Sequence, residues 1–143
     1  MSFQAVITGA GLVSSIGSTR QECWKSVLEG RSGIRELSAL EQGFDPEPIG
    51  GEAERDSEDA SGIPREVIRL RTAMDEVLAE IGLGSPYVPD VRHGIILGTT
   101  LSGMRSGGSY LRSKQPSDIH GFLAASTMDR LLQPYGWSGL AMT

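Results

Sequence analysis

Residues 6–17, VITGAGLVSSIG, join a short apolar run of the β type to a glycine-rich turn. Residues 3–9, FQAVITG, predict a buried strand that ends at Gly9. A glycine-rich turn after a buried strand has two interpretations. It can hold the phosphates of a dinucleotide, or it can be a tight strand-to-helix turn whose glycines permit close packing.

The dinucleotide interpretation requires the pattern G-x-G-x-x-G directly after the strand. Gly9 and Gly11 supply its first two glycines, but Ser14 stands at the third position. The related turn of short-chain reductases, T-G-x-x-x-G-x-G, has Val13 and Ser15 where it needs glycines. No predicted strand ends in an acidic residue about 20 residues further on, where the ribose contact belongs. The sequence therefore favours glycines that permit close packing of the chain. It argues against a nucleotide-dependent reductase.

Helix signals follow the turn. Thr19 and Glu22 have the spacing of a capping box, Gly30 is placed to end the helix, and the apolar stripe between them comprises Cys23, Trp24, Val27 and Leu28. A second helix is predicted over residues 64–80, since Pro64 suits a first turn. One face of that helix is apolar at three- and four-residue spacing, through Ile63, Val67, Leu70, Met74, Val77, Leu78 and Ile81.

The rest of the chain repeats this alternation. Residues 94–99, GIILGT, predict a second buried strand, a helix is expected to begin within 98–110, another lies around 125–132, and a third strand begins near the end. Residues 31–62 show little periodicity and are predicted to be irregular. The order β-α-insertion-α-β-α-β predicts an α/β layer structure with a mainly parallel sheet.

Composition narrows the function classes. The chain has 143 residues and a net charge of -5, which argues against broad nucleic-acid binding. The acidic residues between 45 and 59 predict a solvated surface loop. Cys23 stands alone, and His93 and His120 lack ligand-like spacing with it, so neither a disulfide nor a metal site is expected. No apolar stretch is long enough to span a membrane, and a soluble cytoplasmic protein is the default expectation.

As a longer pattern, residues 6–34 resemble the start of the β-ketoacyl synthases, the condensing enzymes of fatty-acid and polyketide synthesis. The matching elements are VITGAG, Ser14, Gly17, Trp24, Leu28, Gly30 and SGI at 32–34. Residues 94–103 are similar to the second strand and glycine-rich loop of that family, and residues 124–143 to the segment before its nucleophile strand.

The resemblance implies a thiolase-like fold of two similar halves. Residues 1–143 would be the N-terminal part of such a domain, an incomplete first half that stops before the nucleophile elbow. Residues 35–62 would form a variable acidic loop within it. A chain that stops there would expose apolar surface, so a homodimer or larger oligomer is expected.

The family reaction is a decarboxylative Claisen condensation of acyl and malonyl thioesters carried by acyl carrier protein. It uses a cysteine and two histidines and no cofactor. None of them matches Cys23, His93 or His120, so this chain alone is expected to be inactive. The alternative is a non-catalytic ketosynthase-like partner subunit of the chain-length-factor type, which a residue other than cysteine at the elbow would indicate.

The resemblance also assigns binding residues. Leu101, in the loop after the second strand, aligns with a residue beside the acyl chain, and Leu123 and Thr127 match residues that line the pocket of the neighbouring subunit. Arg65, Arg69 and Arg71 lie on or near the polar side of the second helix, and the family docks its acidic carrier proteins on basic patches of this kind. For the first set the alternative is plain core or interface packing, and for the arginines a solvated helix face.

Overall fold

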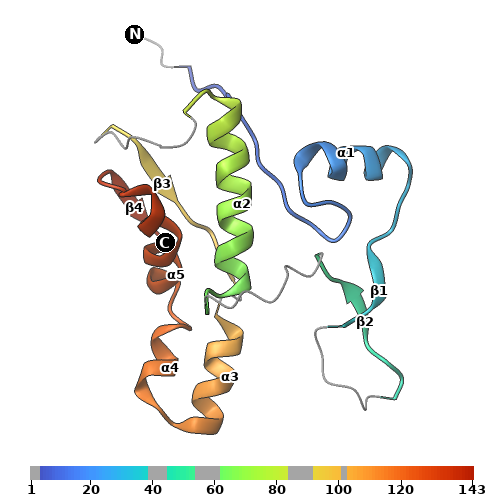
Figure 1. The fold of residues 1–143 in the computed structure, drawn as a ribbon, viewed down its shortest axis with the longest axis vertical. Coiled ribbons are helices and arrows are strands. Elements are labelled where there is room, and N and C mark those ends of the chain that lie inside the picture. The colour runs from blue at the N-terminus through green and yellow to red at the C-terminus, as the bar shows by residue number, and fades with distance from the viewer. Residues whose placement is uncertain (1–3, 39–44, 54–61, 84–91, 101–102) are drawn as a thin grey trace. The chain divides into compact units, whose positions relative to one another are not determined.

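A computed structural model describes residues 4–38, 45–53, 62–83, 92–100 and 103–143 (Figure 1). The chain divides into two compact units. The first contains residues 1–62 and 72–82, and the second contains residues 63–71 and 83–143. The long helix α2, Arg65–Glu80, contributes its beginning to the second unit and its remainder to the first.

Helix α1, Arg20–Leu28, has the predicted caps at both ends. The Thr19 hydroxyl accepts a hydrogen bond from the Glu22 backbone at 3.2 Å, and the Glu22 carboxylate accepts one from the Ser18 backbone at 2.8 Å. Gly30 adopts a positive φ of 64°, and the N–H groups of residues 30 and 31 donate back to the carbonyls of residues 27 and 26. Such an ending requires a left-handed residue, which glycine supplies without steric cost.

The buried face of α1 differs from the predicted stripe. Cys23 and Ser26 are buried, whereas Trp24, Val27 and Leu28 are exposed. Ser26 can be buried because its hydroxyl donates to the carbonyl of Ile16 at 2.7 Å, which satisfies the polar group. The apolar stripe therefore predicted the helix correctly, but it did not predict which face of the helix is buried in this structure.

Two short strands in the first unit were not predicted. Strand β1, Ile34–Glu36, pairs antiparallel with β2, Ile49–Gly51, in the region expected to be irregular. Glu52, expected on a solvated loop, is buried and accepts hydrogen bonds from the backbone and hydroxyl of Ser38, both at 2.9 Å. These buried hydrogen bonds are the reason why the prediction was wrong for Glu52. The acidic residues at positions 54–59 lie outside the described residues.

The predicted first strand is absent from residues 4–9, and its first residue lies outside the described part of the chain. Residues 4–9 pair with no described strand, and Val6 and Ile7 are exposed at 77% and 93%. A β-strand needs a hydrogen-bonded neighbour, and apolar sequence alone does not provide one. The prediction of a buried strand is wrong for this structure.

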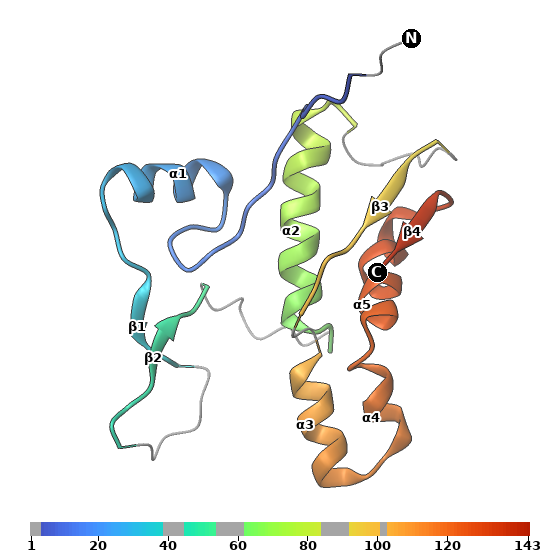
Figure 2. The same cartoon turned by 180° about the vertical axis from the view of Figure 1, so that it is seen from behind.

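The second unit contains the parallel pairing that the sequence predicted. Strand β3, Gly94–Ile96, lies beside β4, Leu140–Met142, with Ile95 opposite Ala141 (Figure 2). Between them the chain forms helices α3, Met104–Ser113, α4, Pro116–His120, and α5, Ala124–Leu132, followed by the 3₁₀ turn η1, Gln133–Tyr135. Parallel strands need a long crossover of this kind. Helix α4 was not predicted. Two two-stranded sheets stand in the described chain, not one mainly parallel sheet.

The core of the second unit is built on α5 and the start of α2. Val67 of α2 is fully buried, and the buried residues of α5 share one face: Thr127, Met128, Leu131 and Leu132. The spacing of these residues follows the helical period, which explains why the helix around 125–132 was predicted correctly. The prediction of a helix over 64–80 is likewise confirmed to within one residue.

Gly11 provides a direct test of the packing interpretation. A Cβ atom at this position would lie 1.8 Å from the carbonyl oxygen of Ala73, inside the first unit. We expect Gly11→Ala to lower the free energy of unfolding by about 1–3 kcal/mol, because backbone must move to admit the methyl group. Urea unfolding followed by circular dichroism measures the change.

Gly98→Ala is the matched control, since a Cβ at Gly98 meets no atom within 4 Å. We expect it to change stability by less than about 0.5 kcal/mol. Equal stability of the two variants would contradict the close approach at Gly11.

Candidate functional site

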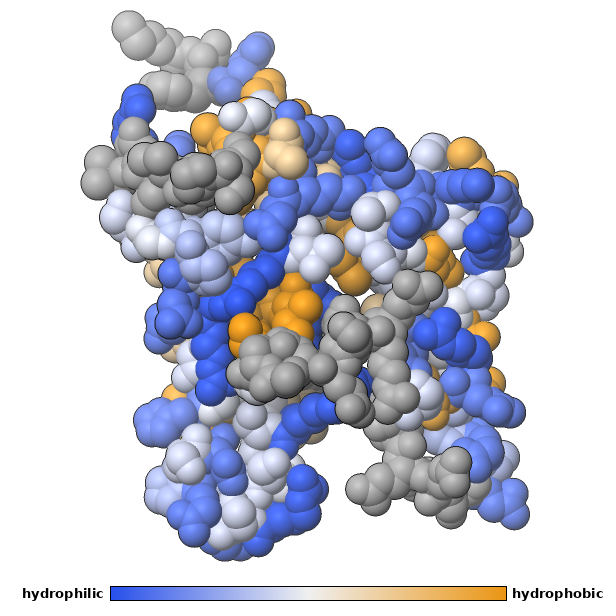
Figure 3. All heavy atoms as spheres, in the orientation of Figure 1, coloured by the Kyte–Doolittle hydropathy of each residue, from blue (hydrophilic) through white to orange (hydrophobic). Residues whose placement is uncertain are grey.

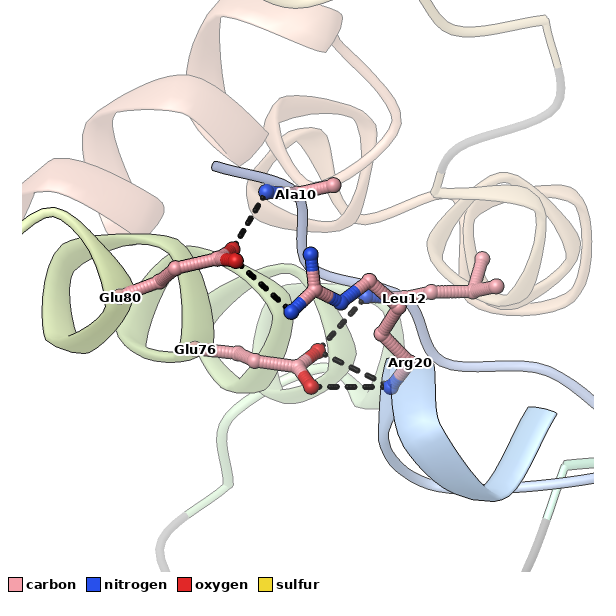
Figure 4. Close-up of polar contacts among 5 residues, drawn as sticks. All are labelled: Ala10, Leu12, Arg20, Glu76 and Glu80. Atoms are coloured by element: carbon pink, nitrogen blue, oxygen red, sulfur yellow. Dashed lines mark hydrogen bonds and ion pairs between the residues drawn. The ribbon is translucent and has the colours of Figure 1, made fainter. Parts of the chain in front are cut away.

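The glycine turn is held by two carboxylates of α2. Glu80 accepts a hydrogen bond from the backbone of Ala10 at 2.9 Å, and Glu76 accepts one from the backbone of Leu12 at 2.9 Å (Figure 4). Glu76 also accepts from the backbone of Arg20 at 2.9 and 3.2 Å, and the Arg20 guanidinium pairs with Glu80 at 2.8 Å. We call Glu76 and Glu80 the carboxylate clamp. Two N–H groups of the turn thus face protein carboxylates and not a phosphate.

The surroundings of Glu80 favour its charged form. The backbone hydrogen bond from Ala10 lowers the pKa of the Glu80 carboxyl below its ordinary value of 4.5, and the hydrogen bond and charge of Arg20 act in the same direction. Desolvation raises this pKa but is the weaker effect. The clamp is therefore an electrostatic contact that depends on ionised Glu80.

This shift predicts how stability changes with pH. A lowered folded-state pKa means that the contribution of Glu80 is fully present above pH 4.5 and is lost as the pH falls through the lowered value. We expect Glu80→Gln to make the free energy of unfolding less dependent on pH in that acidic range. Urea unfolding at a series of pH values measures this dependence.

Arg20→Gln is the companion variant, because it removes the second cause of the shift and keeps the Ala10 hydrogen bond. We expect it to reduce the pH dependence less than Glu80→Gln does. If Glu80→Gln unfolded with the wild-type pH dependence, the clamp would have no electrostatic role.

The occupied turn also predicts the outcome of a nucleotide titration. We expect no saturable change in NADPH fluorescence when this chain is added at concentrations up to about 1 mM, a range in which cofactor sites are normally occupied. A short-chain reductase provides the positive control. Saturable binding would restore the reductase hypothesis.

The second unit contains an open cavity of about 700 Å³. Its wall comes from α2, from the loop after β3 and from α5, through Glu66, Leu70, Leu97, Gly98, Thr99, Thr100 and Thr127. The Glu66 carboxylate accepts a hydrogen bond from the backbone of Gly103 at 3.2 Å, which fixes it near the start of α3. The lining combines aliphatic side chains with threonines and one anchored carboxylate, the mixture of apolar surface and a few polar groups that is typical of small-molecule sites.

The three predicted binding residues differ in their position relative to this cavity. Thr127 is 3% exposed and lines this cavity of its own chain, whereas the resemblance assigned it to the pocket of a neighbouring subunit. Leu123 is the N-cap of α5, is 48% exposed and does not line this cavity. Leu101 lies outside the described residues, although it directly follows Thr100 of the wall. The roles of all three residues remain predictions.

The three arginines lie on α2 and are half-buried. The Arg71 guanidinium donates a hydrogen bond to the backbone carbonyl of Arg130 on α5. Arg71 thus has a contact within the fold, which a fully solvated helix face would lack.

Sequence reasoning missed Glu66 and Leu70. They are four residues apart on α2 and therefore share a face, which the spacing alone could have indicated. That this face meets Thr127 depends on tertiary packing.

The cysteine and the histidines lie away from this cavity. Cys23 is 2% exposed, and its sulfur lies 3.1 Å from the Ser14 hydroxyl and 3.2 Å from the carbonyl oxygen of Gly17. This confirms a small buried core residue. His93 precedes β3, with its ring 6.4 Å from the Trp137 ring, and His120 is exposed in the last turn of α4. Within the described ranges, no cluster of His, Cys, Asp or Glu could hold a metal, and no helix is long and apolar enough to cross a membrane.

Comparison with known proteins supports the predicted resemblance. The chain is 34% identical over 105 residues to 3-oxoacyl-[acyl-carrier-protein] synthase 1 of Escherichia coli, both from strain K12 and from an O6:H1 strain. The similarity covers 67% of this chain and 25% of each relative, so the chain matches about a quarter of their length. No protein-family model matches the chain. These findings support a relationship to ketosynthases.

Proposed function

We propose that this chain is the N-terminal part of a condensing enzyme of the 3-oxoacyl-[acyl-carrier-protein] synthase type. The observation that carries the proposal is the 34% identity over 105 residues to the E. coli enzymes. The parallel β3–β4 pair joined by helices is consistent with part of a layered α/β fold. The proposed reaction class is transfer of an acyl group with carbon–carbon bond formation, in fatty-acid synthesis.

In this proposal the chain supplies scaffold and part of the acyl pocket, not the reacting groups. The condensation needs a thiol that accepts an acyl chain as a thioester, and groups that stabilise the negative charge developing after decarboxylation. Cys23 is unsuited to the first role, since it is buried. Its sulfur also contacts Ser14 and Gly17 within the core of the first unit.

The cavity of the second unit is the proposed section of the acyl pocket. Leu70 and Leu97 offer apolar contact, and Thr127 presents a short side chain from a buried position on α5. Its volume of about 700 Å³ falls within the range of about 300–1,000 Å³ for small-molecule sites. Leu101 would continue this wall, and Leu123 would contact a neighbouring subunit.

The chain on its own is expected to form no acyl thioester. After incubation with acyl-acyl-carrier protein, the intact mass of the chain should remain unchanged, because its thiol is buried. Under the same conditions the E. coli synthase should gain the mass of the acyl group. An acylated Cys23, or condensation product from this chain alone, would contradict the proposal.

Arg65, Arg69 and Arg71 form the proposed docking surface for acyl carrier protein. Their positive charge complements an acidic carrier, and such surfaces act mainly through salt-sensitive encounter. Arg71 already donates to the Arg130 carbonyl, so Arg65 is a better candidate than Arg71 for direct contact with the carrier.

Replacement of these arginines tests the docking surface. In a full-length synthase that contains this sequence, Arg65→Ala with Arg69→Ala should weaken carrier binding by roughly tenfold, with a smaller dependence on salt. Surface plasmon resonance at two salt concentrations measures both effects. Arg105→Ala with Arg112→Ala on α3 is the matched control. Unchanged carrier affinity after loss of Arg65 and Arg69 would remove the docking assignment.

Self-association belongs to the same proposal. Ile96 is 80% exposed, and Leu140 and Met142 are 65% and 52% exposed on β4, while Figure 3 shows apolar atoms open at the surface in several places. Two parallel strands normally have both faces covered. A homodimer or larger oligomer in the cytoplasm, with a partner subunit on such surfaces, is the arrangement we propose.

A further inference from the structure

The first unit contains a second, chemically different cavity. It has a volume of about 520 Å³ and is lined by the turn at 15–18, by one face of α1 and by the segment that enters β1. The α1 residues Glu22, Lys25 and Ser26 are spaced three and four apart, so they share a helix face. The remaining lining residues are Ser15, Ile16, Gly17, Ser18, Arg31, Ser32 and Arg35. Helix α1 and strand β1 follow each other directly in Figure 1.

The walls of this cavity are tied together by short contacts. The buried Ser26 hydroxyl donates to the Ile16 carbonyl at 2.7 Å, which joins α1 to the turn. The Ser14 backbone donates to the Gly17 carbonyl at 2.8 Å and closes the turn itself. A Cβ atom at Gly33 would lie 2.3 Å from the Ser15 hydroxyl, so the segment before β1 lies directly against the turn. The turn, helix α1 and the segment before β1 are therefore held against one another before any ligand binds.

Positive charge exceeds negative charge on these walls. Lys25, Arg31 and Arg35 face a single lining carboxylate, Glu22, although the whole chain has a net charge of -5. Glu22 is engaged by the Ser18 backbone at 2.8 Å. A cluster of like charges is unfavourable unless an anion joins it.

The three cationic side chains of the cavity wall have hydrogen-bond donors that no described residue engages. Arg35 donates one hydrogen bond to the backbone carbonyl of Glu52 at 2.8 Å, and it forms no ion pair with a described residue. Arg31 pairs with Glu29 at 2.5 Å, through one of its nitrogens. Within the described part of the chain, the Lys25 ammonium forms no ion pair or hydrogen bond. Guanidinium forks and an ammonium group beside serine hydroxyls match the oxygens of a phosphate group.

We propose that this cavity binds a small molecule carrying a phosphate monoester, through Lys25, Arg31 and Arg35. The phosphate is held by the three cations, and its organic part occupies the rest of the cavity, since about 520 Å³ is several times the volume of one water, about 30 Å³. The proposal does not rest on the proposed condensing activity, because no acyl group, carrier protein or cavity of the second unit takes part.

Calorimetric titration of this chain tests the site. The probes are glycerol 3-phosphate and inorganic phosphate, each at ionic strength matched with potassium chloride. We expect saturable binding of the monoester, and roughly tenfold weaker binding to a Lys25→Gln, Arg31→Gln variant, because two charge-assisted contacts are lost. Arg105→Gln with Arg112→Gln on α3 removes the same charge elsewhere and should bind like the wild type.

Each alternative result overturns part or all of the proposal. An equal loss in the α3 control means non-specific charge attraction, and a variant that binds like wild type means that the cavity is not the site. If inorganic phosphate binds as tightly as the monoester, the cavity does not recognise the organic part of the ligand. The single variant Lys25→Gln tests the site in case the double variant fails to fold. Circular dichroism should show it folded, since the Lys25 ammonium forms no ion pair or hydrogen bond with a described residue, and it should still bind more weakly.

Discussion

The carboxylate clamp is the contact on which the first unit depends. Glu76 and Glu80, one helical turn apart on α2, hold the backbone of Ala10 and Leu12, and Glu76 also holds the first residue of α1. A single helix thereby fixes both the glycine turn and the start of the next helix. Gly11 lies between the two held positions, where the chain passes so close to Ala73 that a side chain has no room. The two carboxylates accept hydrogen bonds from the turn backbone, as a bound phosphate does in a nucleotide-binding enzyme. The absence of a side chain at Gly11 permits the close approach to α2.

This arrangement explains how a glycine-rich turn of the kind that binds phosphate can instead pack against a helix of the same chain. Backbone N–H groups of a glycine-rich turn attract any nearby anion, and here the anions are supplied by the protein. The positive cavity of the same unit is lined by residues that follow the clamped positions Ala10 and Leu12, from Ser15 to Arg35. The acyl-pocket proposal concerns the second unit, where Thr127 and the loop after β3 share a cavity. Each unit thus has its own cavity, with a different set of lining residues.

Much of the helical structure could be predicted from local signals. Thr19, Glu22 and Gly30 predicted both ends of α1, because caps satisfy backbone groups within a few residues of themselves. The periodic apolar residues predicted α2 and α5 for the same local reason. The short β1–β2 pair was missed, since three-residue strands carry almost no periodic signal. The strand predicted at 3–9 was wrong over its described residues because pairing requires a partner that apolar composition does not guarantee.

The sequence by itself determined helices α1, α2 and α5, the glycines of the turn and the parallel relation of β3 and β4. It also determined the resemblance to ketosynthases, which the identity to the E. coli enzymes supports. Only the tertiary structure decided that Glu76 and Glu80 occupy the turn, that α1 buries Cys23 and Ser26 in place of Trp24, and that Glu66 and Leu70 meet Thr127. The reason is physical. Caps and periodicity act between residues a few positions apart, whereas these contacts join residues more than 50 positions apart in the chain, or depend on which face another element covers.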